Sequence, residues 1–202
     1  QQLTPIARPR DAVFQIPLIG RHNISNLLAA VAVCRLFGIE PESLEAAVTG
    51  LKPAPMRGEM IALTGGARVI LDCYNSSPSA LEAMLEALAE VPAERRIAVL
   101  GGMKELGDGS AALHARCGER AQQCGISLLI LVGDDAAPIG DGAQAAGMPA
   151  SAIERVATPE QAGQRLRELL TSGDVALLKA SRAVRLEKAW DLLRDLVLPI
   201  SN

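Results

Sequence analysis

From residue 53 onward the chain alternates short apolar runs with longer segments of helical periodicity. Short runs rich in branched residues are typical of buried strands, and apolar residues three or four apart are typical of helices with one buried face. Strands are expected at Met60–Thr64, Val69–Tyr74, Ile97–Leu100, Leu128–Val132, Ile153–Val156 and Val175–Lys179. Helices are expected at Ser79–Glu90, Ala111–Gln123, Ala136–Ala146, Pro159–Leu170 and Leu186–Leu196.

The first two of these strands flank Gly65-Gly66, which is a strong signal for an antiparallel hairpin. The remaining strands are each separated by a helix, and such connections join parallel neighbours. The sequence therefore predicts an α/β fold. We expect a mostly parallel sheet with helices on both faces and one antiparallel hairpin.

The first fifty residues have a different pattern. A strand-like run covers Ala12–Ile19, a helix is expected from about Ser25 to Phe37 before Gly38, and a second helix opens at Pro41. Two helices bury too little apolar surface for an independent core. We therefore place a boundary at residues 52/53 and interpret residues 1–52 as the tail of another domain. Gln1 in the first position agrees with a piece of a longer polypeptide.

Composition excludes several classes of function. The formal charge is −3 over 202 residues, and no long basic run occurs, which argues against a nucleic-acid surface. The sequence contains no stretch of about 18 apolar residues, so no membrane span is expected. No signal peptide is evident either. The four cysteines form no CxxC pair and only two histidines are present, so no metal site is expected.

Polar residues gather where the second predicted strand ends. Asp72 is followed by Cys73, Tyr74, Asn75 and Ser76, and then by a second serine and a proline before the next helix. In an open α/β sheet, ligands bind beyond the carboxyl ends of the strands. A plain connection needs only a cap and a turn residue, so this excess of polar side chains predicts a binding site.

Two further segments carry side chains suited to a nucleotide. Gly20-Arg21-His22-Asn23-Ile24-Ser25-Asn26 opens the first helix. Either Asn23 or Ser25 could cap this helix, or Asn23 and Asn26 together could read a purine edge. Arg57 lies in a turn at the domain boundary, where it could reach a phosphate or remain a solvated linker residue.

The ends of two later strands complete the set. A glycine-containing segment follows the third predicted strand, Gly101-Gly102-Met103-Lys104-Glu105-Leu106-Gly107. Its glycines could let a ligand approach the backbone. The dinucleotide-binding pattern GxGxxG is not present. Lys179-Ala180-Ser181-Arg182 suits a carboxylate or phosphate, or forms a turn and a cap. His114 is expected to be structural or to lie at the surface. No GxxxxGK[ST] occurs anywhere in the sequence, so no P-loop is present.

Together these motifs resemble the Mur ligase family, the ATP-dependent amino-acid ligases of peptidoglycan precursor synthesis. The shared elements are Gly20 to Asn26, Arg57 and Asp72, in the expected order. The stretches Asp72 to Pro78, Met103 to Gly107 and Lys179 to Arg182 resemble the branch that joins D-alanyl-D-alanine to UDP-N-acetylmuramoyl-tripeptide. The resemblance covers nearly the whole chain.

The resemblance implies a domain arrangement. Residues 1–52 would be the carboxyl-terminal end of a central P-loop ATPase domain, and residues 53–202 a Rossmann-like ligase carboxyl-terminal domain. The P-loop, the Mg²⁺ ligands and the UDP-sugar pocket would lie upstream. The whole enzyme would be a cytoplasmic bacterial monomer, and residues 1–202 alone would not catalyse ligation.

The resemblance also implies roles for individual residues. Asn23 and Asn26 would hold the adenine of ATP with His22 beside them. Catalysis would involve Arg57 at the phosphates and Asp72 at the ribose or nucleotide. The ATP cleft would also be lined by Tyr74, Asn75 and Ser76, and the incoming D-alanyl-D-alanine would be placed by Lys179, Ser181 and Arg182.

Two positions depart from the branch, which often has an acidic residue in place of Gly102 and a glycine in place of Ala180. Acceptor specificity is therefore less secure than nucleotide binding. One alternative is another Mur branch or a folylpolyglutamate synthase-like ligase. A second is a module that binds a nucleotide or small acid without catalysis.

Overall fold

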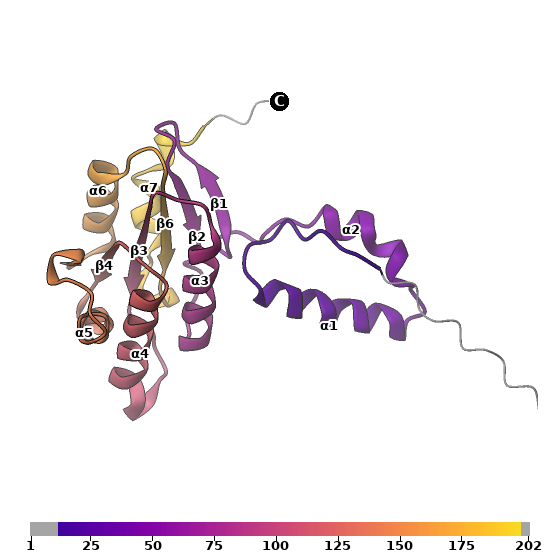
Figure 1. Ribbon diagram of the computed structural model, residues 1–202, viewed down its shortest axis with the longest axis horizontal. Helices are drawn as coiled ribbons and strands as arrows, with labels where there is room; N and C mark the ends of the chain where they lie inside the picture. Colours follow the sequence, from indigo (N-terminus) through magenta and orange to yellow (C-terminus); the bar gives the residue numbers. More distant parts are fainter. Residues whose placement is uncertain (1–11, 199–202) are drawn as a thin grey trace, which may run out of the picture. The chain divides into compact units, whose positions relative to one another are not determined.

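The computed structural model describes residues 12–198, and the chain divides into two compact units, residues 1–52 and 53–202 (Figure 1). The first unit contains helix α1 (His22–Leu36), a 3₁₀ turn (Pro41–Leu44) and the short helix α2 (Glu45–Thr49). The predicted strand at Ala12–Ile19 is wrong, because the described residues of this unit form no strand with which it could pair.

Helix α1 begins three residues earlier than expected. Its N-cap position is Arg21, which makes no side-chain capping bond, so neither Asn23 nor Ser25 is the cap. Apolar side chains of this unit, including Leu28, Leu36 and Phe37, are exposed. Exposed apolar side chains of this kind are typical of a surface that another part of a protein covers.

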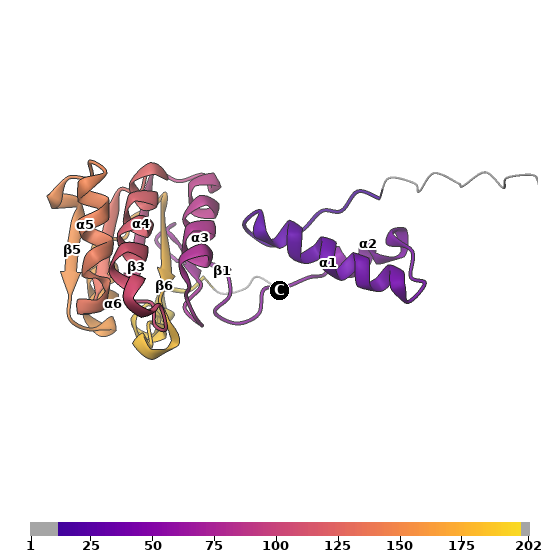
Figure 2. The same cartoon turned by 90° about the horizontal axis from the view of Figure 1, so that it is seen from below.

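The second unit has one six-stranded sheet in the order β1-β2-β6-β3-β4-β5 (Figures 1 and 2). The strands are β1 (Glu59–Ala62), β2 (Arg68–Leu71), β3 (Arg95–Gly101), β4 (Leu128–Val132), β5 (Ile153–Val156) and β6 (Asp174–Lys179). Only the β1–β2 pair is antiparallel, and it forms the predicted hairpin. The other four pairs are parallel, which confirms the predicted α/β sheet.

Helices cover both faces of this sheet, as Figures 1 and 2 show. One face carries α3 (Pro78–Glu90), α4 (Ser110–Gln123) and α5 (Ala137–Ala145), and the other carries α6 (Pro159–Leu169) and α7 (Glu187–Asp191). The helix predicted at Leu186–Leu196 is longer than the observed α7. It stops at Asp191 and is followed by a 3₁₀ turn (Arg194–Leu196), in which three-residue hydrogen bonds replace the helical ones.

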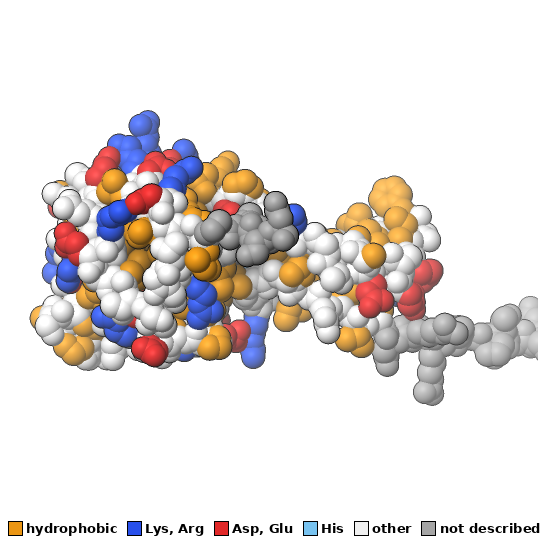
Figure 3. Space-filling view, turned by 90° about the horizontal axis from the view of Figure 1, so that it is seen from above, with side chains coloured by type: hydrophobic (Ala, Val, Ile, Leu, Met, Phe, Trp, Pro, Cys, Tyr) orange, Lys and Arg blue, Asp and Glu red, His pale blue; other side chains and the backbone are white. Residues whose placement is uncertain are grey.

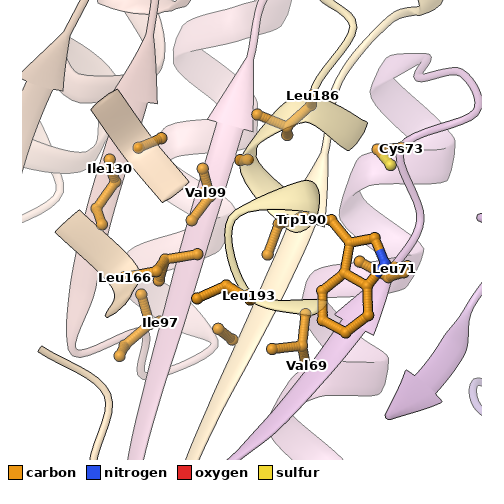
Figure 4. Close-up of a cluster of buried hydrophobic side chains, with 14 of the residues drawn as sticks. Val69, Leu71, Cys73, Ile97, Val99, Ile130, Leu166, Leu186, Trp190 and Leu193 are labelled. Atoms are coloured by element: carbon orange, nitrogen blue, oxygen red, sulfur yellow. The ribbon is translucent and has the colours of Figure 1, made fainter. Parts of the chain in front are cut away.

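The core on the α6/α7 face is a continuous apolar cluster (Figure 4). Trp190 of α7 lies beside Val69 and Leu71 of β2, and Leu166 of α6 packs near Ile97 of β3. Side chains of this size contribute about 1.5–3 kcal/mol each when fully buried. This packing fixes the ends of β2 and β6, where the polar residues begin.

On the opposite face, α4 and α5 approach each other closely at two glycines. A Cβ at Gly118 would lie 1.8 Å from the Ile139 carbonyl oxygen, and one at Gly142 would lie 1.9 Å from that of Ala115. Contacts this short exclude any side chain at either position. No helix within residues 12–198 combines the length and the apolar character that a membrane crossing needs.

Candidate active site

The carboxyl ends of β2, β6 and β3 lie next to one another in the sheet. The chain leaves β2 at Asp72, whose backbone N–H still donates to Leu178 of β6 at 3.0 Å. It leaves β6 at Ala180, and the Ser181 N–H donates to the Gly102 carbonyl beyond β3 at 3.3 Å. The polar residues predicted from three separate segments are therefore held at one edge.

A buried ion pair forms the centre of this edge. Lys179 is 3% exposed, and its Nζ lies 2.5 Å from Oδ2 of Asp72, which is 15% exposed. The same Nζ donates to the Asn75 carbonyl oxygen at 3.1 Å. Lys179 therefore binds protein groups, and it holds both the Asp72 carboxylate and the loop that follows β2.

Arg57 and Tyr74 form a second pair. The guanidinium carbon lies 4.2 Å from the centroid of the Tyr74 ring, within the range of a cation–π interaction. The two segments are also joined by a backbone hydrogen bond of 3.3 Å from Tyr74 to Met56. Met56 and Gly58 have φ values of 57° and 72°, so the backbone turns sharply on both sides of Arg57. Both side chains are exposed, and the Arg57 guanidinium can reach a ligand.

Two buried hydroxyls complete the edge. The Oγ atoms of Ser76 and Ser181 are buried, and neither has a hydrogen-bond partner among the described residues. An unsatisfied buried hydroxyl costs about 1–3 kcal/mol. Such a cost is expected where a ligand completes the hydrogen bonds.

The sequence did not single out Glu187, which begins α7. Its Oε1 lies 2.8 Å from Nη2 of Arg182. Burial raises the pKa of the Cys73 thiol to about 11, and the nearby negative charge of Glu187 adds to the shift. An acidic residue five positions beyond the Lys179-to-Arg182 motif was the available signal for this pair.

The glycines after β3 have a packing role. A Cβ at Gly101 would lie 2.7 Å from the Ala180 Cβ, and one at Gly102 would lie 2.4 Å from the Asp135 Cβ. We expected these glycines to let a ligand approach the backbone. Instead, neighbouring side chains occupy the space beside both Cα atoms. The loop continues to Lys104, which forms an ion pair with Asp135.

Of the two expected places for His114, the buried structural one is found. Its Nε2 accepts from the Met103 N–H at 2.8 Å, and its Nδ1 lies 2.8 Å from the Ser110 carbonyl oxygen. Since that carbonyl can only accept, Nδ1 carries the proton. The ring therefore fixes the β3–α4 loop.

In the first unit, the predicted nucleotide residues lie at the start of α1. Nδ2 of Asn26 donates to Oδ1 of Asn23 at 3.2 Å, and Nδ2 of Asn23 donates to the Ile19 carbonyl at 2.8 Å. The Nδ1 of His22 is buried without a partner in the described part of the chain. The two amides border a hollow of about 260 Å³ whose other walls are mostly apolar.

The described residues contain no cluster of three His, Cys, Asp or Glu side chains that could hold a metal ion. On the face of the second unit seen in Figure 3, Lys and Arg side chains are interspersed with Asp and Glu side chains. That face therefore shows no large patch of one charge. With neither a metal cluster nor such a patch, the polar edge described above remains the candidate site of the second unit.

Residues 56–182 match the family described as Mur ligase, glutamate ligase domain. The chain belongs to the Mur ligase family. The match covers β1 to β6 and ends at Arg182, so it includes the Asp72–Lys179 pair and Arg57.

Two curated relatives that cover most of the chain carry the same name. The UDP-N-acetylmuramoyl-tripeptide–D-alanyl-D-alanine ligase of Bacillus subtilis is 32% identical over 93% of this chain and 40% of its own length. The ligase of the same name from Synechocystis is 35% identical over 85% of this chain and 37% of its own length. The chain thus spans about two fifths of these relatives.

Solved structures agree with this fold. The MurF ligase of Thermotoga maritima, determined in complex with ADP, has a TM-score of 0.75 and 28% identity over 88% of this chain and 39% of that one. A MurF structure from Acinetobacter baumannii has a TM-score of 0.78 at 24% identity over 90% of this chain and 39% of that one, a likeness of fold.

Proposed function

We propose that this chain is the carboxyl-terminal part of an ATP-dependent ligase that joins D-alanyl-D-alanine to UDP-N-acetylmuramoyl-tripeptide in peptidoglycan precursor synthesis. The observation that carries the proposal is the polar edge at the carboxyl ends of β2, β6 and β3. Two relatives named as ligases of this specificity match 93% and 85% of the chain. A bacterial cytoplasmic enzyme that acts as a monomer fits this reaction.

In the proposed reaction ATP is a substrate that supplies a phosphoryl group to the tripeptide carboxylate. The amine of the dipeptide then attacks the resulting acyl phosphate, a C–N bond forms, and inorganic phosphate leaves. Phosphoryl transfer requires mainly positioning and charge stabilisation from the protein. The residues at the edge of the sheet are suited to those two tasks.

Arg57 and Asp72 are the proposed catalytic pair of the second unit. Arg57 presents an exposed guanidinium, whose planar fork matches phosphate oxygens. Asp72 is held by Lys179 and would accept a hydrogen bond from the nucleotide ribose. Tyr74 would keep Arg57 in place, while Asn75 and Ser76 would line the same nucleotide site.

Residues 1–52 are proposed to be the end of the central ATPase domain, and residues 53–202 to belong to the Rossmann-like carboxyl-terminal domain. In the first unit the amides of Asn23 and Asn26, with His22 beside them, would read the adenine edge. The ligands of Mg²⁺ are expected in the upstream sequence.

The dipeptide is proposed to bind at the end of β6. Arg182 would take its carboxylate and Ser181, with its unpartnered buried hydroxyl, would donate or accept a further hydrogen bond. Lys179 would act indirectly, because its ammonium is already bound to Asp72 and Asn75.

The decisive experiment measures ADP release by the longer protein that contains this chain. We expect release only when ATP, UDP-N-acetylmuramoyl-tripeptide and D-alanyl-D-alanine are all present. ADP release with L-alanine and UDP-N-acetylmuramate, or with a diamino acid and UDP-N-acetylmuramoyl-L-alanyl-D-glutamate, would indicate another Mur branch. ADP release with folate and glutamate would indicate a folylpolyglutamate synthase-like ligase. ADP binding without any ligation would indicate a binding module. Residues 1–202 alone are expected to be inactive, because their sequence contains no P-loop.

A further inference from the structure

Arg182 does not stand alone at the end of β6. Its side chain is 54% exposed, and Nη2 lies 2.8 Å from Oε1 of Glu187, whose side chain is only 22% exposed. The two residues are joined through the compact turn Arg182–Val184 and the start of α7. An exposed arginine samples many rotamers unless a fixed partner holds it, and Glu187 is such a partner.

Glu187 is itself held in a constrained position. Its second oxygen, Oε2, is buried and has no hydrogen-bond partner among the described residues. Burying a carboxylate oxygen without a donor is unfavourable for folding. Packing alone would be served better by an apolar residue, so the carboxylate has a role beyond packing.

The Arg182–Glu187 pair borders a hollow in the surface. The hollow of about 580 Å³ is bordered by three cationic and two acidic side chains, those of Arg182, Arg185, Lys188, Glu187 and Asp191. Lys188 is bound by Glu160 at 2.8 Å. A guanidinium has five N–H donors in a planar fork, so contact with one oxygen of Glu187 leaves donors for a second carboxylate.

We propose that Glu187 is a positioning residue that orients Arg182 so that the free edge of its guanidinium binds the carboxylate of D-alanyl-D-alanine. This inference rests on the proposed function. Glu187 does not touch the reacting atoms, so it affects capture of the dipeptide and not the chemical step. Loss of its charge lowers dipeptide affinity, whereas a carboxylate that merely competed with the ligand would raise affinity when removed.

Steady-state kinetics of the longer ligase with Glu187→Gln test the proposal. We expect the KM for D-alanyl-D-alanine to rise roughly tenfold, with the KM for ATP unchanged and kcat altered less than about twofold. Glu187→Asp keeps the charge and is expected to recover part of the loss. Glu160→Gln is the matched control, because it removes an exposed carboxylate bound to the neighbouring Lys188 and leaves every kinetic constant unchanged.

An unchanged or lowered KM for the dipeptide in Glu187→Gln would overturn the inference, and so would an equal change in Glu160→Gln. Thermal unfolding of each variant shows whether the protein is folded. If Glu187→Gln does not fold, the same KM comparison is made with Glu187→Asp, whose KM must lie above that of the unaltered enzyme. If the unaltered enzyme catalyses ligation and Glu187→Gln has the same KM for the dipeptide, this inference alone is refuted. If the unaltered enzyme does not catalyse ligation, the proposed function is refuted as well.

Discussion

Lys179 of β6 and Asp72 at the end of β2 form an ion pair of 2.5 Å at the edge where the polar residues gather. The two strands are neighbours and parallel, so the pair joins them where their backbone hydrogen bonds end. Because Lys179 is almost fully buried, its positive charge is stable there only next to a negative one. The pair therefore fixes the direction in which Asp72 faces.

Removing one partner should cost more than removing both. Lys179→Met leaves the Asp72 carboxylate in a desolvated position without its ammonium, and we expect a loss of about 3 kcal/mol in the free energy of unfolding. Asp72→Asn leaves a buried ammonium and should cost at least as much. The double variant should regain much of the stability, because neither charge of the pair remains. Urea unfolding of the four proteins measures the coupling. Strictly additive losses would contradict a coupled pair.

The close contact of α4 with α5 predicts that a side chain at Gly118 destabilises the fold. Gly118→Ala would place a methyl group 1.8 Å from the Ile139 carbonyl oxygen, so one helix must move. Overpacking of this kind typically costs about 1–3 kcal/mol, and thermal unfolding should detect it. Gly65→Ala is the control, because no atom lies within 4 Å of the added Cβ. Equal stability of the two variants would show that the helices are not in close contact.

Burial predicts unreactive thiols beside the site. It raises the pKa of Cys117 to about 12 and, with the charge of Glu187, that of Cys73 to about 11. Since the thiolate is the reactive form, iodoacetamide at pH 8 should label Cys73 roughly 100-fold and Cys117 roughly 1,000-fold more slowly in the folded protein than in urea. Mass spectrometry of the separate peptides gives each rate. Rapid labelling of Cys73 before unfolding would mean that the end of β2 opens.

The fold of the second unit was predictable from its pattern. The periodicity of four of its helices and the branched apolar runs gave elements close to those observed, because local pattern and tertiary packing agree there. Ala12–Ile19 failed because a strand requires a partner, which local sequence does not reveal. Leu186–Leu196 failed because Trp190 and Leu193 are both drawn into the core, which tightens the turn between them.

The candidate site was predictable in part. Strand ends in a parallel sheet meet at one edge, so the nearness of Asp72 and Lys179 follows from topology. The direct pairing of their side chains does not, nor does the contact of Arg182 with Glu187, because both depend on rotamers set by the surrounding packing. The packing role of Gly102 depends on Asp135, which is distant in sequence.

A buried carboxylate at the other end of β6 should govern stability in acid. Asp174 is 1% exposed and receives Arg95 in a fork, from Nε to Oδ1 at 2.8 Å and from Nη2 to Oδ2 at 2.5 Å. Thr171 adds a backbone N–H at 2.8 Å. Burial acts to raise the pKa of Asp174, but these hydrogen bonds outweigh it and hold the pKa below the ordinary 3.8.

The sign of the effect follows from that direction. The folded protein binds a proton at Asp174 less readily than the unfolded chain, so the group stabilises the fold above about pH 4. This contribution is lost as pH falls through the lower pKa of the folded state. Asp174→Asn should lower the free energy of unfolding by about 2–3 kcal/mol at pH 7, with a smaller difference below pH 4. Urea unfolding of both proteins from pH 3 to pH 7 measures both values. A difference that stays constant with pH would mean that Asp174 is not charged in the folded protein at pH 7.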